Sequence, residues 1–239
     1  GNATIQKPAS KTPLCSLLLA QIAYESGLPA GGLSVLPMGG AESELLTSDD
    51  RFKLLTFTGS AEVGWALREK AKRKRVALEL GGNAGVIVHD DANIEDAAAK
   101  CAAGGFSYAG QSCIAVQRIV VQERAYDRFL EMLVDRVGEL KVGNPLDETT
   151  DVGPLISEED ARRVESWISE ARDGGSRVLI GGNREDALVE PTVLSGTDPA
   201  MKVNCEEIFG PVVTVEKYTT FQDALHAVNN SRYGLQAGG

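Results

Sequence analysis

Short apolar runs that favour β-strands alternate with helix-like segments along the chain, and this alternation limits the fold more than any other feature. The runs "LSVLP" and "FKLLTFTGS" end in turn residues, and the helix-like segment "AEVGWALREKA" separates the second run from "RVALELGG". Strands that alternate with helices are joined by crossover connections, which place them side by side in a parallel sheet. The sequence therefore predicts an α/β protein.

The pattern restarts after the Gly81-Gly82 pair, which ends the first set of strands and helices. We see no internal repeat and no low-complexity linker. A length of 239 residues allows one or two domains. We therefore expect two domains, at residues 1–80 and 81–239.

Capping residues and apolar periodicity locate the helices. The first is expected after Ser10 or Thr12, with Pro13 in its first turn. In the second part of the chain, helices are predicted over four segments: Ile94–Ala103, 126–137, 161–171 with Ser157 and Asp160 as a capping pair, and 220–231. The segment "VGNPLDETTDVGPLIS" between the second and third of these is dense in turn formers and is predicted to be a loop.

Composition and charge exclude several classes of partner. A net charge of −10 argues against binding to nucleic acid or to an anionic membrane surface. No apolar run is long enough to cross a bilayer, and a cytoplasmic location is expected. The four cysteines show no paired spacing, so neither a zinc site nor a disulfide framework is suggested, and we expect no metal. The basic run "REKAKRKR" is interpreted as the solvated end of a helix rather than a phosphate patch or a nuclear signal.

Cys113 stands in "GQSCIA", after small and flexible residues and before a strand-like run. It could be a reactive thiol or a small buried hydrophobic residue, and free cysteine is more often the second. A reactive thiol usually has a histidine beside it, but the chain has only His89 and His226. Each of these histidines is more simply explained as structural, so a cysteine protease is not favoured.

Acidic residues offer a candidate general base. Glu79 lies in the apolar run "LELGG", where a buried carboxylate would have a raised pKa that suits base catalysis. The alternative, an exposed glutamate on an edge strand, is equally consistent with this stretch alone. Glu206 and Glu207 precede the apolar turn "IFGP", and on pattern alone they are two exposed acids beside a turn.

The stretch "TFTGSAEVG" is a candidate phosphate site. Its strand leads through Gly59 and Ser60 to the start of a helix, where free N–H groups and the helix dipole attract anions. Lys7 follows a neighbouring strand and could add a cation. In an open α/β sheet, ligands bind at the carboxyl ends of the strands, where both features would lie.

Taken together and in order, the stretches "KPAS", "FTGSAEVG", "LELGG", "GQSC", "VGNP", "GPLI" and "EEIFGP" resemble the aldehyde dehydrogenase superfamily over the whole chain. This resemblance implies a partial Rossmann-like cofactor domain up to about Leu80, followed by an α/β catalytic domain. It implies that Cys113 is the catalytic thiol and Glu79 the general base. The residues that it implies for binding NAD or NADP are Lys7, Ser10, Gly59, Ser60, Glu207 and Phe209.

The resemblance further implies a small-molecule aldehyde as the substrate and a parent enzyme that is a homodimer or homotetramer. The chain opens and closes in the middle of predicted structure, and the Pro-Trp-Asn motif of the family is absent. We therefore expect a fragment of a longer polypeptide that is inactive, or nearly so, alone. Two alternatives stay open: a non-catalytic remnant that keeps the fold, and a coenzyme A-acylating enzyme, which Glu79 makes less favoured.

Overall fold

In the computed structural model, which describes residues 1–239, the backbone divides between Leu80 and Gly81 into two units. Unit 1 is Gly1–Leu80 and unit 2 is Gly81–Gly239. Parallel strands with helical crossovers occur in both units, so the predicted α/β class is confirmed. None of the helices is both long and apolar enough to span a membrane.

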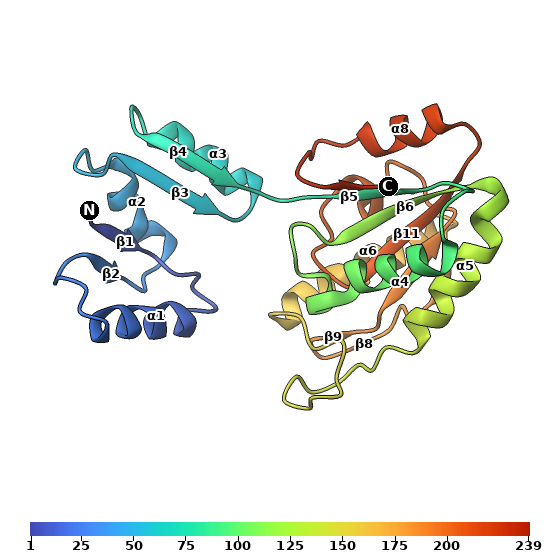
Figure 1. Cartoon of the computed structure of the whole chain (residues 1–239), viewed down its shortest axis with the longest axis horizontal. Coiled ribbons are helices and arrows are strands. Elements are labelled where there is room, and N and C mark those ends of the chain that lie inside the picture. The colour runs from blue at the N-terminus through green and yellow to red at the C-terminus, as the bar shows by residue number, and fades with distance from the viewer. The chain divides into compact units, whose positions relative to one another are not determined.

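Unit 1 consists of two successive β-α-β units, and their strands do not form one continuous sheet (Figure 1). Its elements are β1 (Thr4–Gln6), α1 (Leu14–Glu25), β2 (Leu33–Val35), α2 (Gly40–Ser48), β3 (Leu54–Thr58), α3 (Ala61–Lys70) and β4 (Arg75–Glu79). β1 pairs in parallel with β2, and β3 with β4, and the two pairs form separate two-stranded sheets. The crossover helices α1 and α3 are what parallel pairing requires.

Few residues of unit 1 are buried. The buried residues of this unit are Pro8, Thr47, Gly64 and Ala71, and α1 has none. The apolar positions that predicted an amphipathic α1 are therefore exposed within this chain. Because most folding free energy comes from apolar burial, unit 1 has little to stabilise it.

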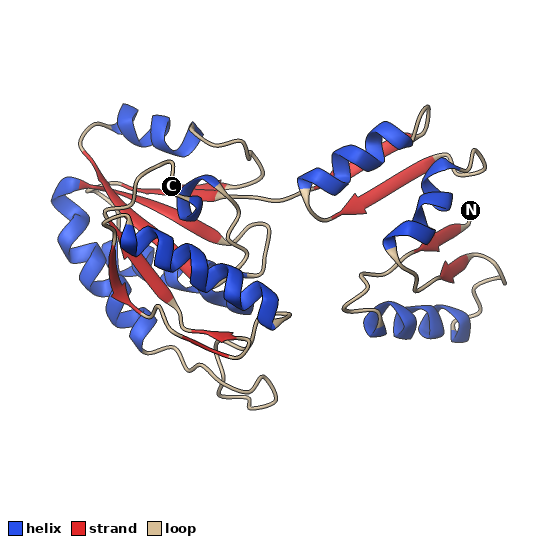
Figure 2. Ribbon diagram, turned by 180° about the vertical axis from the view of Figure 1, so that it is seen from behind, coloured by secondary structure: helices blue, strands red, loops and turns tan.

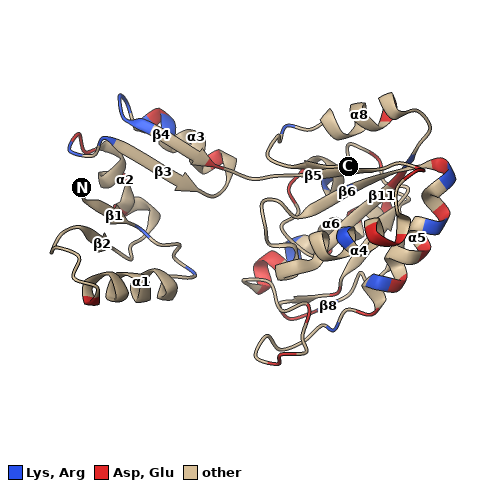
Figure 3. Ribbon diagram, in the orientation of Figure 1, with Lys and Arg blue, Asp and Glu red and all other residues tan.

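The start of α1 differs from the sequence prediction. The helix begins at Leu14 and its N-cap is Pro13, without a side-chain cap from Ser10 or Thr12. α2 was not predicted, because it follows two glycines and has no capping side chain to mark its start. The basic run lies where predicted, at the end of α3 and in the following turn (Figure 3).

Unit 2 is built on one six-stranded sheet (Figure 2). Its strands are β5 (Ala84–Val88), β6 (Val116–Gln122), β7 (Arg177–Ile180), β10 (Thr192–Ser195), β11 (Val212–Tyr218) and β12 (Ala237–Gly238), with a separate hairpin of β8 (Arg184–Glu185) and β9 (Leu188–Val189). The helices are α4 (Ile94–Phe106), the 3-10 helix η1 (Ser107–Gly110), α5 (Glu123–Gly138), α6 (Glu158–Asp173), α7 (Lys202–Cys205) and α8 (Phe221–Asn229).

The strand order is β12-β5-β6-β11-β10-β7, and only β7 runs antiparallel to its neighbour. Successive side chains of a strand point to opposite faces. Ile119 and Val121 of β6 belong to the main core together with α4 and α5, whereas Val120 packs under α8 with Tyr218 and Ala224. Helices thus cover both faces of the sheet, which explains why the strands read as continuous apolar runs.

The four helices predicted in this unit are all present as α4, α5, α6 and α8. Their caps are side chains: Asn93 caps α4, Ser157 accepts from the Asp160 N–H at the start of α6, and Thr220 forms a capping box with Asp223. The predicted loop between α5 and α6 is also present. The short strand β10 and the β8–β9 hairpin were not predicted.

Candidate active site

Cys113 lies in a turn between η1 and β6. The Ala115 N–H donates to the Ser112 carbonyl at 3.0 Å across this turn, and Cys113 is half-buried. Its carbonyl faces Gly82, where a Cβ atom would lie only 2.0 Å from the carbonyl oxygen. Glycine at position 82 is therefore what allows the thiol-bearing turn to approach the start of β5.

Backbone conformations of high energy precede the thiol. Tyr108, Ala109 and Gly110 all have positive φ, at 53°, 56° and 68°. Glycine adopts this region freely, but tyrosine and alanine do so at a cost. A Cβ on Gly110 would also lie 2.1 Å from the Gly210 carbonyl oxygen, so two glycines bring this turn against the segment before β11. Backbone strain of this kind is concentrated at functional sites.

Glu207 lies in the same neighbourhood. Its Oε1 accepts a hydrogen bond of 2.8 Å from the Gly82 N–H, the residue that faces Cys113. Burial raises the pKa of Glu207, and the bond from Gly82 and the charge of Arg163 oppose that rise. Unit 2 therefore brings both the Cys113 turn and the Glu207 carboxylate against Gly82.

Ile208 anchors the segment that carries Glu207 and Phe209. It is buried, its N–H donates to Gln117 Oε1 at 3.0 Å, and its carbonyl accepts from Arg163 Nη1 at 2.8 Å. Phe209 follows with a φ of 49° and remains 41% exposed. Ile208 therefore fixes the backbone that carries both Glu207 and Phe209.

Gln117 holds this segment from the strand β6. Its Nε2 donates to the carbonyls of Val203 and Glu206, at 3.1 and 2.7 Å, and its Oε1 accepts from Ile208. The side chain is 5% exposed, and its amide meets three backbone groups. Buried backbone groups need such partners, so Gln117 fixes the conformation of residues 203–208.

Asn83 and Arg118 extend the support. Asn83 Nδ2 donates to the carbonyls of Asn204 and Glu206, at 2.8 and 3.0 Å, and its Oδ1 accepts from Arg118 Nε. Arg118 also donates to the carbonyls of Ala227 and Val228, near the end of α8. These positions were not predicted to support the site. The polar pair "QR" inside an otherwise apolar strand is the signal that could have indicated buried hydrogen-bonding side chains.

Unit 1 holds the other predicted residues. Ser60 is the N-cap of α3, and its Oγ accepts from the Val63 N–H at 3.4 Å. Gly59 precedes it, and a Cβ there would lie 2.6 Å from the ring of Phe57. A Cβ on Gly64, one turn into α3, would lie 2.4 Å from Leu80. The two glycines of the motif therefore allow α3 to lie close to β3 and its neighbours.

Lys7 and Ser10 are brought together just after β1. Lys7 Nζ donates to Ser10 Oγ at 3.3 Å and to the Pro8 carbonyl at 3.1 Å. Ser10 is exposed. The pair offers a cation and a hydroxyl next to each other, as an anionic or polyhydroxylated ligand requires.

Glu79 ends β4, and its carbonyl accepts from the Gly59 N–H at 3.0 Å. Its side chain is exposed within this chain, so the burial that would suit a general base is not present in unit 1. The alternating exposure of β4 matches the second reading of this stretch, an edge-strand glutamate.

The other cysteines differ from Cys113 in their surroundings. Cys101 is buried in α4, and burial raises its pKa to about 12, which removes its thiolate at neutral pH. Cys15 and Cys205 are exposed. Cys205 ends α7 two residues before Glu207, whereas Cys113 lies in the turn that faces Gly82.

Comparison with known proteins gives one consistent result. The family model described as the aldehyde dehydrogenase family matches residues 1–238. A 3-sulfolactaldehyde dehydrogenase from Priestia aryabhattai is 45% identical over 239 residues, which are all of this chain and 50% of that protein. The chain thus spans about half the length of the curated relatives it matches.

Solved structures share the fold. An NAD-dependent aldehyde dehydrogenase from Sinorhizobium meliloti has a TM-score of 0.95 at 38% identity, covering 98% of this chain and 48% of that one. A glyceraldehyde-3-phosphate dehydrogenase, GapN, from Methanocaldococcus jannaschii, solved with NADP, also has a TM-score of 0.95 at 38% identity. This match covers 99% of the present chain and 53% of the GapN chain.

Proposed function

The chain belongs to the aldehyde dehydrogenase family, and from that premise we propose that it carries the thiol-bearing part of an enzyme that oxidises an aldehyde to a carboxylic acid with NAD or NADP. The observation that carries this proposal is the turn of Cys113, half-buried against Gly82 and close to the Glu207–Phe209 segment. Cys113 and Glu79 are the proposed catalytic residues.

The proposed reaction begins when the Cys113 thiolate adds to the carbonyl carbon of the aldehyde. The carbonyl oxygen becomes an oxyanion, which the backbone N–H of Cys113 stabilises. An aldehyde is electrophilic enough to react without a histidine beside the thiol, which agrees with the scarcity of histidine in this chain. A nicotinamide bound beside this carbon would accept the hydride that leaves it, and the carbonyl would then re-form as a thioester on Cys113.

Water then cleaves the thioester. We propose that Glu79 removes a proton from this water, whose oxygen adds to the acyl carbon while the Cys113 thiolate leaves. The products are the free carboxylic acid and the regenerated thiolate. A coenzyme A-acylating enzyme would pass the acyl group to another thiol and has no use for a base here, so the presence of Glu79 favours hydrolysis.

We propose that residues of each unit contribute to binding a dinucleotide. The N-terminus of α3, with Gly59 and Ser60, offers N–H groups to a pyrophosphate. Lys7 is the proposed ligand of the adenosine ribose. The Glu207 carboxylate is suited to ribose hydroxyls, and the exposed ring of Phe209 to packing near a nicotinamide.

Ser10 bears on the choice between NAD and NADP. The family resemblance implies an acid at this position in NAD-preferring relatives, and here a hydroxyl lies 3.3 Å from Lys7 Nζ. A neutral residue beside a cation does not repel a 2′-phosphate. We therefore propose that the parent enzyme accepts or prefers NADP. Ser10→Glu is expected to lower kcat/KM for NADP about tenfold or more relative to NAD. A strong NAD preference that this variant leaves unchanged would contradict the proposal.

We further propose that the isolated chain is inactive or nearly so, because it spans half the length of its relatives. Loss of a single group that donates a hydrogen bond to the oxyanion lowers the rate on the order of a hundred- to a thousand-fold.

The parent enzyme is proposed to be a cytoplasmic homodimer or homotetramer without a nucleic-acid partner, in line with the net charge of −10. The remaining alternative is a non-catalytic remnant that keeps the fold.

The decisive experiment uses a polypeptide of the relatives' length that contains this segment. NAD and NADP reduction are measured over a panel of aldehydes for the unchanged protein, Cys113→Ala and the control Cys15→Ala. We expect turnover to fall below detection in Cys113→Ala and to persist in Cys15→Ala, because Cys15 is an exposed thiol of α1. Full turnover in Cys113→Ala would refute the mechanism, and no turnover of the unchanged protein would favour the remnant.

A further inference from the structure

The side chain of Gln117 bonds to the backbone on both sides of Glu207. Its Nε2 donates to the Glu206 carbonyl at 2.7 Å, and its Oε1 accepts from the Ile208 N–H at 3.0 Å. A backbone peptide of a neighbouring strand would offer the same donor and acceptor. The amide of Gln117 therefore replaces a strand at this point and holds the backbone of Glu207 in one conformation.

We propose that Gln117 is a positioning residue for the nicotinamide half of the cofactor. The inference rests on the proposed function, in which the Glu207 carboxylate and the Phe209 ring contact that half of the dinucleotide. Gln117 is 5% exposed and lies inside the sheet, so it acts through this segment rather than by touching the cofactor. Its replacement should therefore change the affinity for the cofactor.

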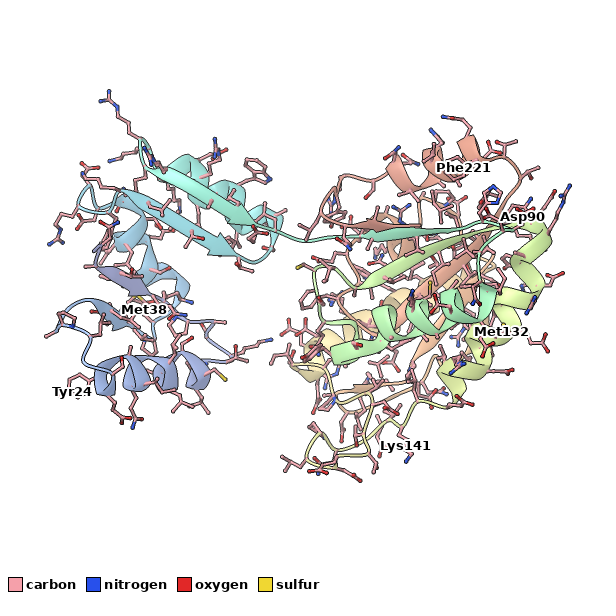
Figure 4. The ribbon with its side chains drawn as sticks, viewed as in Figure 1. Tyr24, Met38, Asp90, Met132, Lys141 and Phe221 are labelled. Carbon is pink, nitrogen blue, oxygen red and sulfur yellow. The ribbon has the colours of Figure 1, made fainter.

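Polar side chains on both faces of the sheet lead to the same segment. Gln117 and Arg118 are consecutive in β6, so their side chains point to opposite faces. Figure 4 shows the two faces, with the labelled Phe221 of α8 on one side of the strands and the labelled Met132 of α5 on the other. Arg118 donates to carbonyls of α8 and, through Nε, to Asn83 Oδ1.

Asn83 completes the support from the second face. Its Nδ2 donates at 3.0 Å to the Glu206 carbonyl, which also accepts from Gln117. A carbonyl oxygen has two lone pairs, and two side-chain amides use both of them here. The residue before Asn83 is Gly82, whose N–H donates to Glu207 Oε1. The backbone before Glu207 and its carboxylate are thus held by neighbouring residues.

A second buried glutamine of β6 shows what a purely structural amide does. Gln122 is 7% exposed, and its Oε1 accepts from the Arg124 N–H at 2.6 Å as the N-cap of α5. This bond spans two positions of the chain, whereas the bonds of the Gln117 side chain span 86 to 91. Gln122 therefore stabilises a nearby helix, and Gln117 holds a distant segment that carries proposed cofactor ligands.

The test uses the polypeptide of the relatives' length and measures the dissociation constants of NADH and NADPH from their fluorescence. Gln117→Met keeps a side chain of similar size and removes the bonds to Val203, Glu206 and Ile208. We expect the dissociation constant of the cofactor that the unchanged protein binds to rise about tenfold or more, because small displacements of ligand-binding groups are costly.

The matched control is Gln122→Met, which removes the cap of α5 and lowers stability. It should bind the cofactor as tightly as the unchanged protein does. A merely structural role of Gln117 would likewise leave the dissociation constant unchanged, because partial unfolding lowers the number of binding sites and not the affinity of those that remain.

Gln117→Glu decides the case in which Gln117→Met does not fold. The introduced carboxyl can accept from Ile208 but donates to the carbonyls only when it is protonated, and burial favours the protonated form. Binding should therefore be weakened and then recover, relative to the unchanged protein, as the pH is lowered from about 8 to about 6.

Two results would contradict the inference and leave the proposed function intact. The first is unchanged affinity in both Gln117 variants, and the second is an equal loss of affinity in Gln122→Met. An unchanged protein that binds neither NADH nor NADPH would instead overturn the proposed function, and the inference with it.

Discussion

At the residue scale, Glu207 links the fold of unit 2 to its proposed chemistry. Its carboxylate is half-buried, accepts one hydrogen bond from Gly82, and has a raised pKa because burial disfavours the charged form. A charge kept in such a position lowers stability. Residues that serve a ligand are often retained at that cost.

Glu207→Gln therefore has a predictable pH signature. A carboxyl whose pKa is higher in the folded than in the unfolded state binds more protons when folded, so stability falls as pH rises from its ordinary value of 4.5 through the raised value. The neutral amide removes this loss, and its oxygen can still accept from Gly82. We expect the variant to unfold at a higher urea concentration than the parent at pH 7, with the difference disappearing below about pH 4.

The measurement follows Trp167 fluorescence in a Trp65→Phe background, so that only unit 2 reports. Glu206→Gln serves as a control, since that carboxylate pairs with Arg232 and its replacement should not stabilise. Equal urea midpoints for Glu207→Gln and the parent at pH 7 would contradict the burial argument.

At the scale of elements, the site depends on three strands that begin at one edge. β5, β6 and β11 are adjacent and parallel, so the segments before them meet. Glycines at positions 82 and 110 allow contacts of backbone with backbone that no side chain could fit. The close packing at this edge therefore depends on the absence of a Cβ atom at Gly82 and Gly110.

Gly82→Ala tests that dependence. Its Cβ would lie 2.0 Å from the Cys113 carbonyl oxygen, which is backbone and cannot rotate away. We expect a loss of about 1–3 kcal/mol in the free energy of unfolding of unit 2, together with faster alkylation of Cys113 as its turn is displaced. Gly234→Ala is the matched control because nothing lies within 4 Å of its Cβ position. A Gly82→Ala chain with unchanged stability and thiol reactivity would show that the contact is relaxed at no cost.

Elements that carry their own signals could be predicted from the sequence. The helix α6 combines a cap at Ser157 with buried residues at Ala161, Val164 and Ile168, and both features are local. β10 has no alternation because all four of its residues are buried, and the N-cap of α2, Gly39, has no side chain to mark the start of the helix. Such elements depend on their neighbours in space.

The residues of the candidate site also divide into those that could be predicted from the sequence and those that could not. Cys113, Glu207 and Phe209 could be proposed because their peptides resemble a known family. Gln117 could not, because a polar residue on a strand reads as solvent-facing until the segment that it bonds is known. The sequence left Glu79 open to two interpretations, a buried base or an exposed edge-strand residue, and its side chain is exposed.

At the scale of the whole molecule, the two units differ in how much they bury. The main core cluster and the smaller one under α8 both consist of unit 2 residues. Unit 1 instead exposes apolar side chains along α1, with Leu14 at 77% and Tyr24 at 78%. Contiguous exposed apolar surface is typical of faces that contact other protein.

Limited proteolysis should separate the units. Regions with few buried apolar contacts open at low free energy, and a protease cleaves the open form. We expect trypsin to degrade unit 1 first, with cleavage in the exposed basic turn after α3 at Lys72 or Arg73, and to leave a resistant product that contains Gly81–Gly239. Mass spectrometry of a time course identifies its ends. The exposed tryptic sites of unit 2, such as Lys141, provide an internal control. Cleavage at these sites as early as at Lys72 would contradict the argument, because exposure alone, and not the small core of unit 1, would then set the rate.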